Sequence, residues 1–140
     1  MSIHYCNEDV SVPKFPKRKI TNWIKETIVA EEKTTGDISF IFCSDDYLLE
    51  VNNQYLKHDF YTDIITFDYV ENNVISGDIF ISCDRVNENA TEFGTGFENE
   101  LLRIIIHGVL HLLGYKDKNK KDKLMMTYKE DFYLHVLSNS

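Results

Sequence analysis

The chain has 140 residues, of which 43% are hydrophobic and 27% are charged, and this balance excludes a disordered protein. Its length predicts a single domain, residues 1–140, with one hydrophobic core. Fifteen Lys and Arg residues oppose twenty-three Asp and Glu residues, and the net charge of −8 excludes a uniformly basic nucleic-acid coat, although a local basic patch could still bind RNA.

The first half of the chain predicts two helices separated by a strand. Residues 10–16 carry both prolines and predict an extended lead-in, and residues 17–32 have the apolar spacing of an amphipathic helix. Residues 37–43 alternate as a strand. Ser44 is a candidate N-cap for a second helix, which we expect to continue to Tyr55.

The middle of the chain predicts a β-hairpin followed by a helix. Residues 62–70 and 74–83 are rich in Ile, Phe and Thr, and a Glu-Asn-Asn turn signal separates them. Gly77 suggests a bulge or a close approach within the second strand. Residues 84–93 predict a helix with Asp84 as its N-cap.

Two helices complete the chain. Residues 97–113 form a strongly apolar helix that we expect to stop at Gly114, and residues 120–137 predict the last helix. In the last helix we expect five apolar side chains to face inward: Leu124, Met125, Tyr128, Phe132 and Val136. The element order predicts an α+β fold, with a small mixed sheet of about four strands and about five helices.

The cysteines and the N-terminal residues indicate the cellular compartment in which the protein is expected. Cys6, Cys43 and Cys83 form no CxxC pair, and we expect them to be buried thiols in a reducing environment. The first residues lack the basic start and apolar stretch of a signal peptide, and no run approaches the ~18 apolar residues of a membrane span. We therefore expect a cytoplasmic protein.

The segment HGVLHLLGYKD carries the chemistry. His107 and His111 are four residues apart, so a helix places both imidazoles on one face. Gly114 can adopt positive φ and turn the chain back, which would bring Asp117 to the same ion. Two histidines and one carboxylate leave a coordination position open, and this pattern favours catalytic zinc. The alternatives are two core histidines and a solvated aspartate.

The residues near His107 help to distinguish between classes of metal-dependent hydrolase. A metalloprotease helix has Glu directly after its first histidine, whereas this chain has Gly108. Glu100 and Arg103 share the face of His107, where Glu100 could orient a histidine or accept a proton and Arg103 could contact a phosphate. The alternative for these two residues is an intrahelical ion pair.

Five lysines lie within residues 116–123, just after the second histidine, although the chain is acidic overall. Beside an open metal site they suit a polyanionic substrate such as RNA. The alternative is a solvated, mobile turn. The lysines are Lys116, Lys118, Lys120, Lys121 and Lys123.

HGVLHLLGYKD resembles the signature of the YbeY family of rRNA maturation endoribonucleases. In the same order, VNNQY, TDIITF and SGDIFIS resemble other segments of that family, and Met125 and Glu130 fall where the family keeps a Met and an acid. The resemblance implies a sheet flanked by helices with one zinc in a groove. It also implies a cytoplasmic bacterial endoribonuclease that cuts single-stranded RNA in small-subunit rRNA maturation, including its 3′ end, and in ribosome quality control, with ribosomal proteins and a ribosome-associated GTPase as partners.

Two departures from the family pattern affect these expectations. Asp117 stands where the family has a third histidine, so manganese or nickel joins zinc as a candidate ion. Leu56 stands where the family has an arginine. Four cations are candidates to replace that arginine, and we favour Arg85 among them: Lys57, His58, Arg85 and Arg103.

The sequence therefore predicts a metal-dependent endoribonuclease. Its metal ligands are His107, His111 and Asp117, and its candidate catalytic residues are Arg85, Glu100 and His58. Two other functions stay open. A metallopeptidase would share the ligands but lacks the adjacent Glu, and a non-catalytic ribosome-assembly factor with a structural metal is favoured by the missing arginine.

Overall fold

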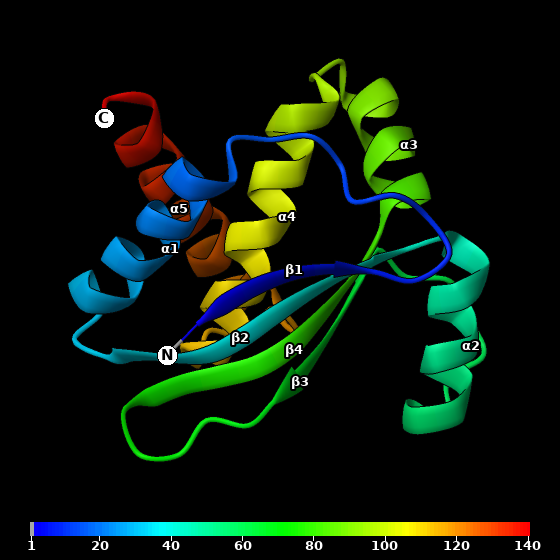
Figure 1. Ribbon diagram of the computed structural model, residues 1–140, viewed down its shortest axis with the longest axis horizontal. Helices are drawn as coiled ribbons and strands as arrows, with labels where there is room; N and C mark the ends of the chain where they lie inside the picture. Colours follow the sequence, from blue (N-terminus) through cyan, green and yellow to red (C-terminus); the bar gives the residue numbers. More distant parts are fainter. Residues whose placement is uncertain (1) are drawn as a thin grey trace.

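The computed structural model describes residues 2–140, over which five helices and four strands follow one another (Figure 1). This confirms the predicted α+β class. None of the helices in this part of the chain is long and apolar enough to cross a membrane. In chain order the elements are β1 (Ile3–Asn7), α1 (Lys17–Ala30), β2 (Thr34–Cys43), α2 (Asp45–Leu56), β3 (Ile64–Asp68), β4 (Val74–Ser82), α3 (Cys83–Phe93), α4 (Phe97–Leu112) and α5 (Lys120–Ser138).

The sheet is mixed and has the strand order β1-β2-β4-β3. β1, β2 and β4 run parallel, and β3 pairs antiparallel with β4, which confirms the predicted hairpin. β1, a five-residue edge strand, was not predicted from the sequence. The register shifts in β2 between Thr35 and Ile38, so the bulge lies in β2 and not at Gly77. Gly77 instead marks a close approach, because a Cβ there would meet the Phe67 carbonyl and the Leu112 side chain.

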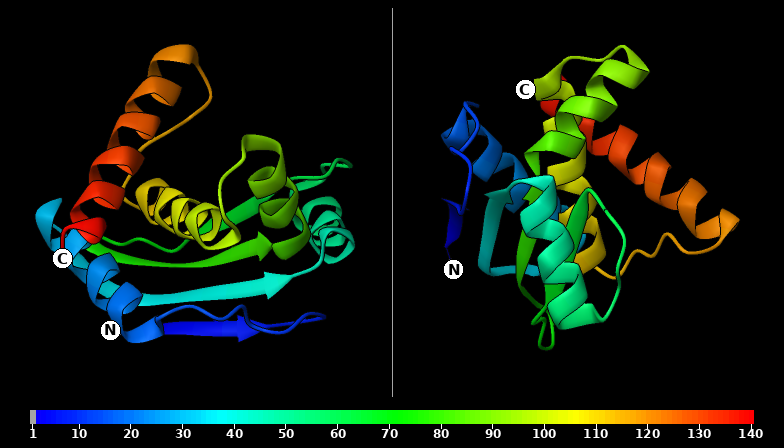
Figure 2. Two further views of the ribbon diagram at one scale, coloured as in Figure 1. Left: turned by 90° about the horizontal axis from the view of Figure 1, so that it is seen from above. Right: turned by 90° about the vertical axis from the view of Figure 1, so that its right-hand side faces the viewer.

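Alternate side chains of the strands point to opposite faces of the sheet, and each face is covered by different helices. Phe40 and Ile79 belong to the larger hydrophobic cluster, which also contains buried residues of α1, α4 and α5. Phe67 and Phe80 pack with the smaller cluster, which contains residues of α2. Figures 1 and 2 show α1, α4 and α5 grouped together, with α2 standing apart from them at one end of the strands.

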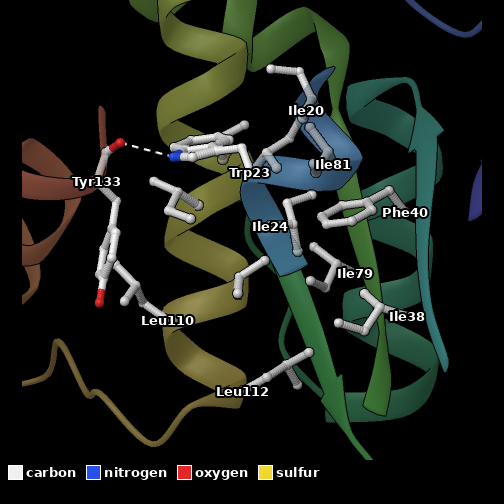
Figure 3. Packing of buried hydrophobic residues seen from close by; sticks show 14 of the residues in the cluster. Ile20, Trp23, Ile24, Ile38, Phe40, Ile79, Ile81, Leu110, Leu112 and Tyr133 are labelled. Carbon is white, nitrogen blue, oxygen red and sulfur yellow. Dashed lines mark hydrogen bonds between the residues drawn. The ribbon is translucent and has the colours of Figure 1, made fainter. Parts of the chain in front are cut away.

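The larger cluster joins both terminal helices to the sheet (Figure 3). Trp23 of α1 is 2% exposed, and its indole N–H donates to the Tyr133 carbonyl oxygen of α5 at 2.8 Å. A buried indole needs such an acceptor, because an unpaired N–H in an apolar core is costly. This bond holds α5 beside α1.

The prediction of which face of α5 points into the core is wrong. The five apolar residues expected to point into the core are 38–65% exposed: Leu124, Met125, Tyr128, Phe132 and Val136. The buried stripe instead consists of Met126, Glu130, Tyr133 and Leu137. α5 has apolar residues on both sides, so its sequence periodicity does not identify the face that packs against α4.

Two smaller expectations also change. Cys43 is buried, Cys83 is half-buried and Cys6 is exposed, so the expectation of three buried thiols is wrong for Cys6. The N-cap of α3 is Ser82, whose hydroxyl accepts from the Arg85 backbone N–H at 3.2 Å, and not Asp84. Ser44 does cap α2, as the sequence predicts.

Candidate metal centre and the groove beside it

The histidine pair lies on α4, and glycine allows this helix to approach the sheet closely. A Cβ on Gly108 would lie 2.9 Å from the Ile79 side chain and 3.1 Å from that of Ile64. Gly108 is therefore buried against the sheet. His107 and His111 lie on a less buried part of the helix surface, because both are only half-buried. A glutamate at position 108, as in metalloproteases, would therefore clash with the strands.

The turn after α4 brings Asp117 back to the histidines. Gly114 has φ +103°, a conformation that residues with a Cβ rarely adopt. Asp117 Oδ2 lies 3.3 Å from His107 Nε2 and 3.4 Å from His111 Nε2. The predicted juxtaposition of these three residues is present, and they form a group able to hold a metal ion.

The distances from the Asp117 oxygen to the two imidazoles fit a tetrahedral ion. With metal–ligand distances of about 2.0–2.1 Å, neighbouring ligands of a tetrahedral zinc are separated by about 3.3–3.4 Å. The two distances from Asp117 to the imidazoles match this separation and are longer than an ordinary hydrogen bond. The donor set of two imidazoles and one carboxylate is also one that zinc accepts with a fourth position open.

Each imidazole is oriented through its other nitrogen. His107 Nδ1 donates to Glu130 Oε2 at 2.6 Å, and His111 Nδ1 donates to the Tyr115 carbonyl oxygen at 3.0 Å. Because both acceptors are oxygens, the proton of each neutral imidazole lies on Nδ1, and Nε2, within 3.4 Å of Asp117 Oδ2, is the atom left to bind a metal. Such orientation by a second layer of partners is characteristic of metal-binding histidines.

The pKa values of the two imidazoles are shifted in opposite directions. Burial lowers the pKa of His107, but the hydrogen bond and negative charge of Glu130 outweigh burial, so this pKa lies above its ordinary value. Burial lowers the pKa of His111, and the nearby His107 lowers it further. A neutral imidazole is the form that binds a metal, and the lowered pKa of His111 favours that form, whereas His107 is the more basic of the two.

Glu130 is anchored from its other side. Arg103 Nη1 lies 2.8 Å from Glu130 Oε1, and Arg103 Nη2 lies 2.7 Å from Asp131 Oδ1. The alternative of a Glu100–Arg103 pair along α4 is wrong, because the guanidinium is held by α5. Glu100 instead accepts from the Thr95 hydroxyl at 3.0 Å.

Two hollows flank the metal centre. A groove of about 690 Å³ lies on the His111 side, and His58, Asp117 and Lys118 also line it. A pocket of about 200 Å³ lies on the His107 side. Its polar lining residues are Asp63, Asn89, Glu100, Arg103, His107 and Glu130. The groove has the size of a small-ligand site, for which the usual range is roughly 300–1,000 Å³.

The predicted catalytic residues occupy different places around these hollows. His58 lines the groove and Glu100 lines the pocket. Arg85 is bound elsewhere: its Nε donates to Asp45 Oδ1 at 3.0 Å, and its guanidinium lies 5.3 Å from the ring centre of Tyr61. Leu56, where the resemblance led us to expect an arginine, lines the groove.

Two acids were not assigned to the site from the sequence. Glu130 stands out in the sequence only as an acid in the last helix, and its bond to His107 spans 23 residues, so no local pattern could reveal it. Asp63 belongs to the quoted TDIITF segment and lines the pocket beside His107. Burial raises the pKa of Asp63, against the opposing influence of His107.

The chain also matches a known protein family along almost its full length. The model of the family described as Endoribonuclease YbeY matches residues 3–138. The chain belongs to the YbeY endoribonuclease family. The resemblance seen in HGVLHLLGYKD and its companion segments is thereby confirmed.

Relatives in this family cover most of the chain. The Endoribonuclease YbeY of Parabacteroides distasonis is 52% identical over 98% of this chain and 96% of its own length. That of Flavobacterium psychrophilum is 54% identical over 84% of this chain and 86% of its own. A solution structure of a Thermotoga maritima protein has a TM-score of 0.69 and 33% identity, over 97% of this chain and 89% of that protein.

Proposed function

We propose that this protein is a metal-dependent endoribonuclease that cuts single-stranded RNA, with zinc as its ion. We place its work in the cytoplasm, in the maturation of small-subunit rRNA and in ribosome quality control, with ribosomal proteins and a ribosome-associated GTPase as partners. The chain acts as one domain in this proposal. Membership of a family whose relatives are named Endoribonuclease YbeY supports the RNA substrate.

One observation carries the proposal. Two imidazoles, each oriented by an acceptor at Nδ1, place their Nε2 atoms 3.3 and 3.4 Å from a single carboxylate oxygen beside an open groove. A structural zinc site would use four protein ligands, whereas this group offers three and leaves one position for water or substrate. A zinc ion held by these three residues would act as a Lewis acid toward phosphate and would lower the pKa of bound water.

The protein's own side chains complete the chemistry. His58 and Lys118 line the groove, where they attract and position the phosphate backbone. Asp63 and Glu100 line the pocket on the other side of the centre, where either carboxylate can take up a proton from the attacking hydroxyl group. Arg85 joins them only if its bond to Asp45 opens, so we rank His58 and Lys118 above it as replacements for the family arginine.

The metallopeptidase alternative loses support from the packing of α4. Its general base would occupy position 108, where a Cβ would lie 2.9 Å from Ile79. The protein would then have to cut peptides without the glutamate that such enzymes place beside the ion. We expect metal-loaded protein to leave casein intact and to cut single-stranded RNA, and the reverse result would favour the peptidase.

A ligand variant separates the enzyme from a non-catalytic assembly factor. We expect wild-type protein to cut a fluorescent single-stranded RNA, to lose this activity in EDTA and to recover it with zinc. His111→Ala, checked for its fold by circular dichroism, should bind RNA but leave it uncut. A metal-loaded, folded wild-type protein that binds RNA without cutting it would instead support the assembly factor.

A further inference from the structure

The end of α2 and the loop that leads to β3 expose three aromatic side chains. Tyr55, Phe60 and Tyr61 are 62%, 56% and 46% exposed. Large aromatic side chains usually bury most of their surface, so an exposed one that lines a groove suggests a binding role. Of the three, Phe60 lines the groove that also contains His111 and Asp117.

Phe60 already takes part in one stacked pair. Its ring centre lies 5.1 Å from that of His58, and the two planes differ by 21°. Both residues line the groove. His58 stacks against the Phe60 ring and more than half of Phe60 remains exposed, so the pair leaves aromatic surface to which a third flat ring can bind.

A buried asparagine fixes this pair in place. Asn52 is 2% exposed, and its side-chain Nδ2 donates to the Phe60 carbonyl oxygen at 2.9 Å. Its main-chain carbonyl oxygen accepts from the His58 backbone N–H at 3.1 Å. One residue of α2 therefore holds the backbone of both stacked residues. A platform fixed before binding loses less entropy when a ligand arrives.

We propose that the stacked pair of His58 and Phe60, called the stacking platform below, binds one unpaired RNA base within the groove. Lys118 lines the same groove and offers a cation to the phosphate attached to that base. Bases within a duplex already stack on neighbours and present no free face, whereas unpaired bases stack readily on aromatic side chains. The platform thus gives the proposed nuclease its preference for single strands.

This inference rests on the proposed function, because the groove that holds the platform also reaches the metal ligands His111 and Asp117. A base bound on Phe60 anchors the RNA beside the reactive centre. The platform contributes through substrate binding, so its loss should raise KM more than it lowers kcat.

The first experiment measures the affinity of a fluorescein-labelled single-stranded RNA of about eight nucleotides by anisotropy, in EDTA so that the RNA is bound and not cut. Phe60→Ala should bind roughly 5- to 150-fold more weakly, as expected for the loss of one stacked base. Phe60→Trp should keep the affinity, and its fluorescence should be quenched on binding. Tyr128→Ala, which removes a 64% exposed aromatic of α5, is the matched control and should bind as the wild type does.

The second experiment links Phe60 to a particular base. A set of RNAs, each lacking the base at one position, is titrated against the wild type and Phe60→Ala. For the wild type, removal of the base at one position should weaken RNA binding. For Phe60→Ala, removal of the same base should not change the affinity, because that base no longer stacks on Phe60. Equal losses in both proteins, or unchanged affinity in Phe60→Ala, would overturn the platform.

The two proposals fail in different ways. If the wild type cuts single-stranded RNA and Phe60→Ala shows the same affinity and KM, the nuclease stands and the platform is wrong. If metal-loaded wild type neither binds nor cuts single-stranded RNA, the proposed function is itself wrong.

Discussion

His107 and His111 carry the same side chain one turn apart on α4, yet different structures hold them. His107 depends on a buried carboxylate from α5, which Arg103 anchors in turn. His111 depends on a main-chain carbonyl of the turn that follows its own helix. Side-chain mutations can therefore disturb His107 directly, whereas His111 responds mainly to changes in the backbone of the turn. Asp117 faces both, so its loss should affect both equally.

The largest expected effect is the loss of the shared ligand. Asp117→Ala should reduce zinc affinity by more than about 100-fold, because even partners behind the ligands cost 10- to 100-fold. Elemental analysis of purified protein should find near-stoichiometric zinc in the wild type and little in the variant. Asp122→Ala, which removes a carboxylate from the first turn of α5, is the control and should retain zinc.

Glu130→Gln tests the His107 side. An amide has no negative charge to support the imidazole, so we expect zinc affinity to fall by roughly 10- to 100-fold. A competition titration with a zinc-binding dye measures the change. Asp131→Asn alters the other carboxylate held by Arg103 and should have a much smaller effect. Equal effects of the two variants would mean that Glu130 does not act through His107.

Gly114→Ala tests the His111 side. A Cβ at Gly114 meets no atom within 4 Å, so the cost arises from φ +103° and should be about 1–3 kcal/mol of unfolding free energy. Because the turn carries both Tyr115 and Asp117, zinc affinity should fall as well. Gly94→Ala provides the comparison, since Gly94 also has positive φ with open space around it but ends α3. It should lose similar stability and keep its zinc affinity.

The smallest expected effect concerns Glu31, which binds Tyr115 in the turn after α4. Tyr115 donates to Glu31 at 2.6 Å, and Tyr133 and Lys129 also donate to this carboxylate. Burial raises the pKa of Glu31, but these three hydrogen bonds outweigh burial and lower it overall. Glu31→Gln should destabilise the protein by about 1–2 kcal/mol at neutral pH, because hydrogen bonds to an amide are weaker than those to a charged group.

The stability difference between the wild type and Glu31→Gln should depend on pH. A lowered folded-state pKa stabilises the protein above the ordinary glutamate value of 4.5, and this stability disappears as the pH falls through the folded-state pKa. Urea unfolding of wild type and Glu31→Gln should therefore differ most at neutral pH and converge below about pH 4.5. A constant difference across this range would show that the charge of Glu31 is not involved.

Local patterns predicted the metal centre well. The four-residue spacing of the histidines, the glycine and the following acid all lie within residues 107–117, so helix geometry and one turn determine their meeting. Asp63 and Glu130 reach the same centre from distant segments. Only the packing of α5 against α4 and of β3 beside α4 brings them there, and no spacing rule encodes that packing.

The last helix shows the opposite result. Its apolar residues lie on two faces, and the buried stripe includes the charged Glu130. A pattern search selects the more apolar stripe, but the structure buries the acid because His107 and Arg103 satisfy it. β1 was missed for a simpler reason, since five residues at a sheet edge alternate too briefly to indicate a strand.

X-ray absorption at the zinc edge of the purified protein tests the central claim most directly. The account predicts four nitrogen or oxygen neighbours at about 2.0–2.1 Å, with the scattering pattern of two imidazoles and no sulfur. A sulfur neighbour at about 2.3 Å, or a shell without imidazole, would place the ion away from His107 and His111 and contradict the account.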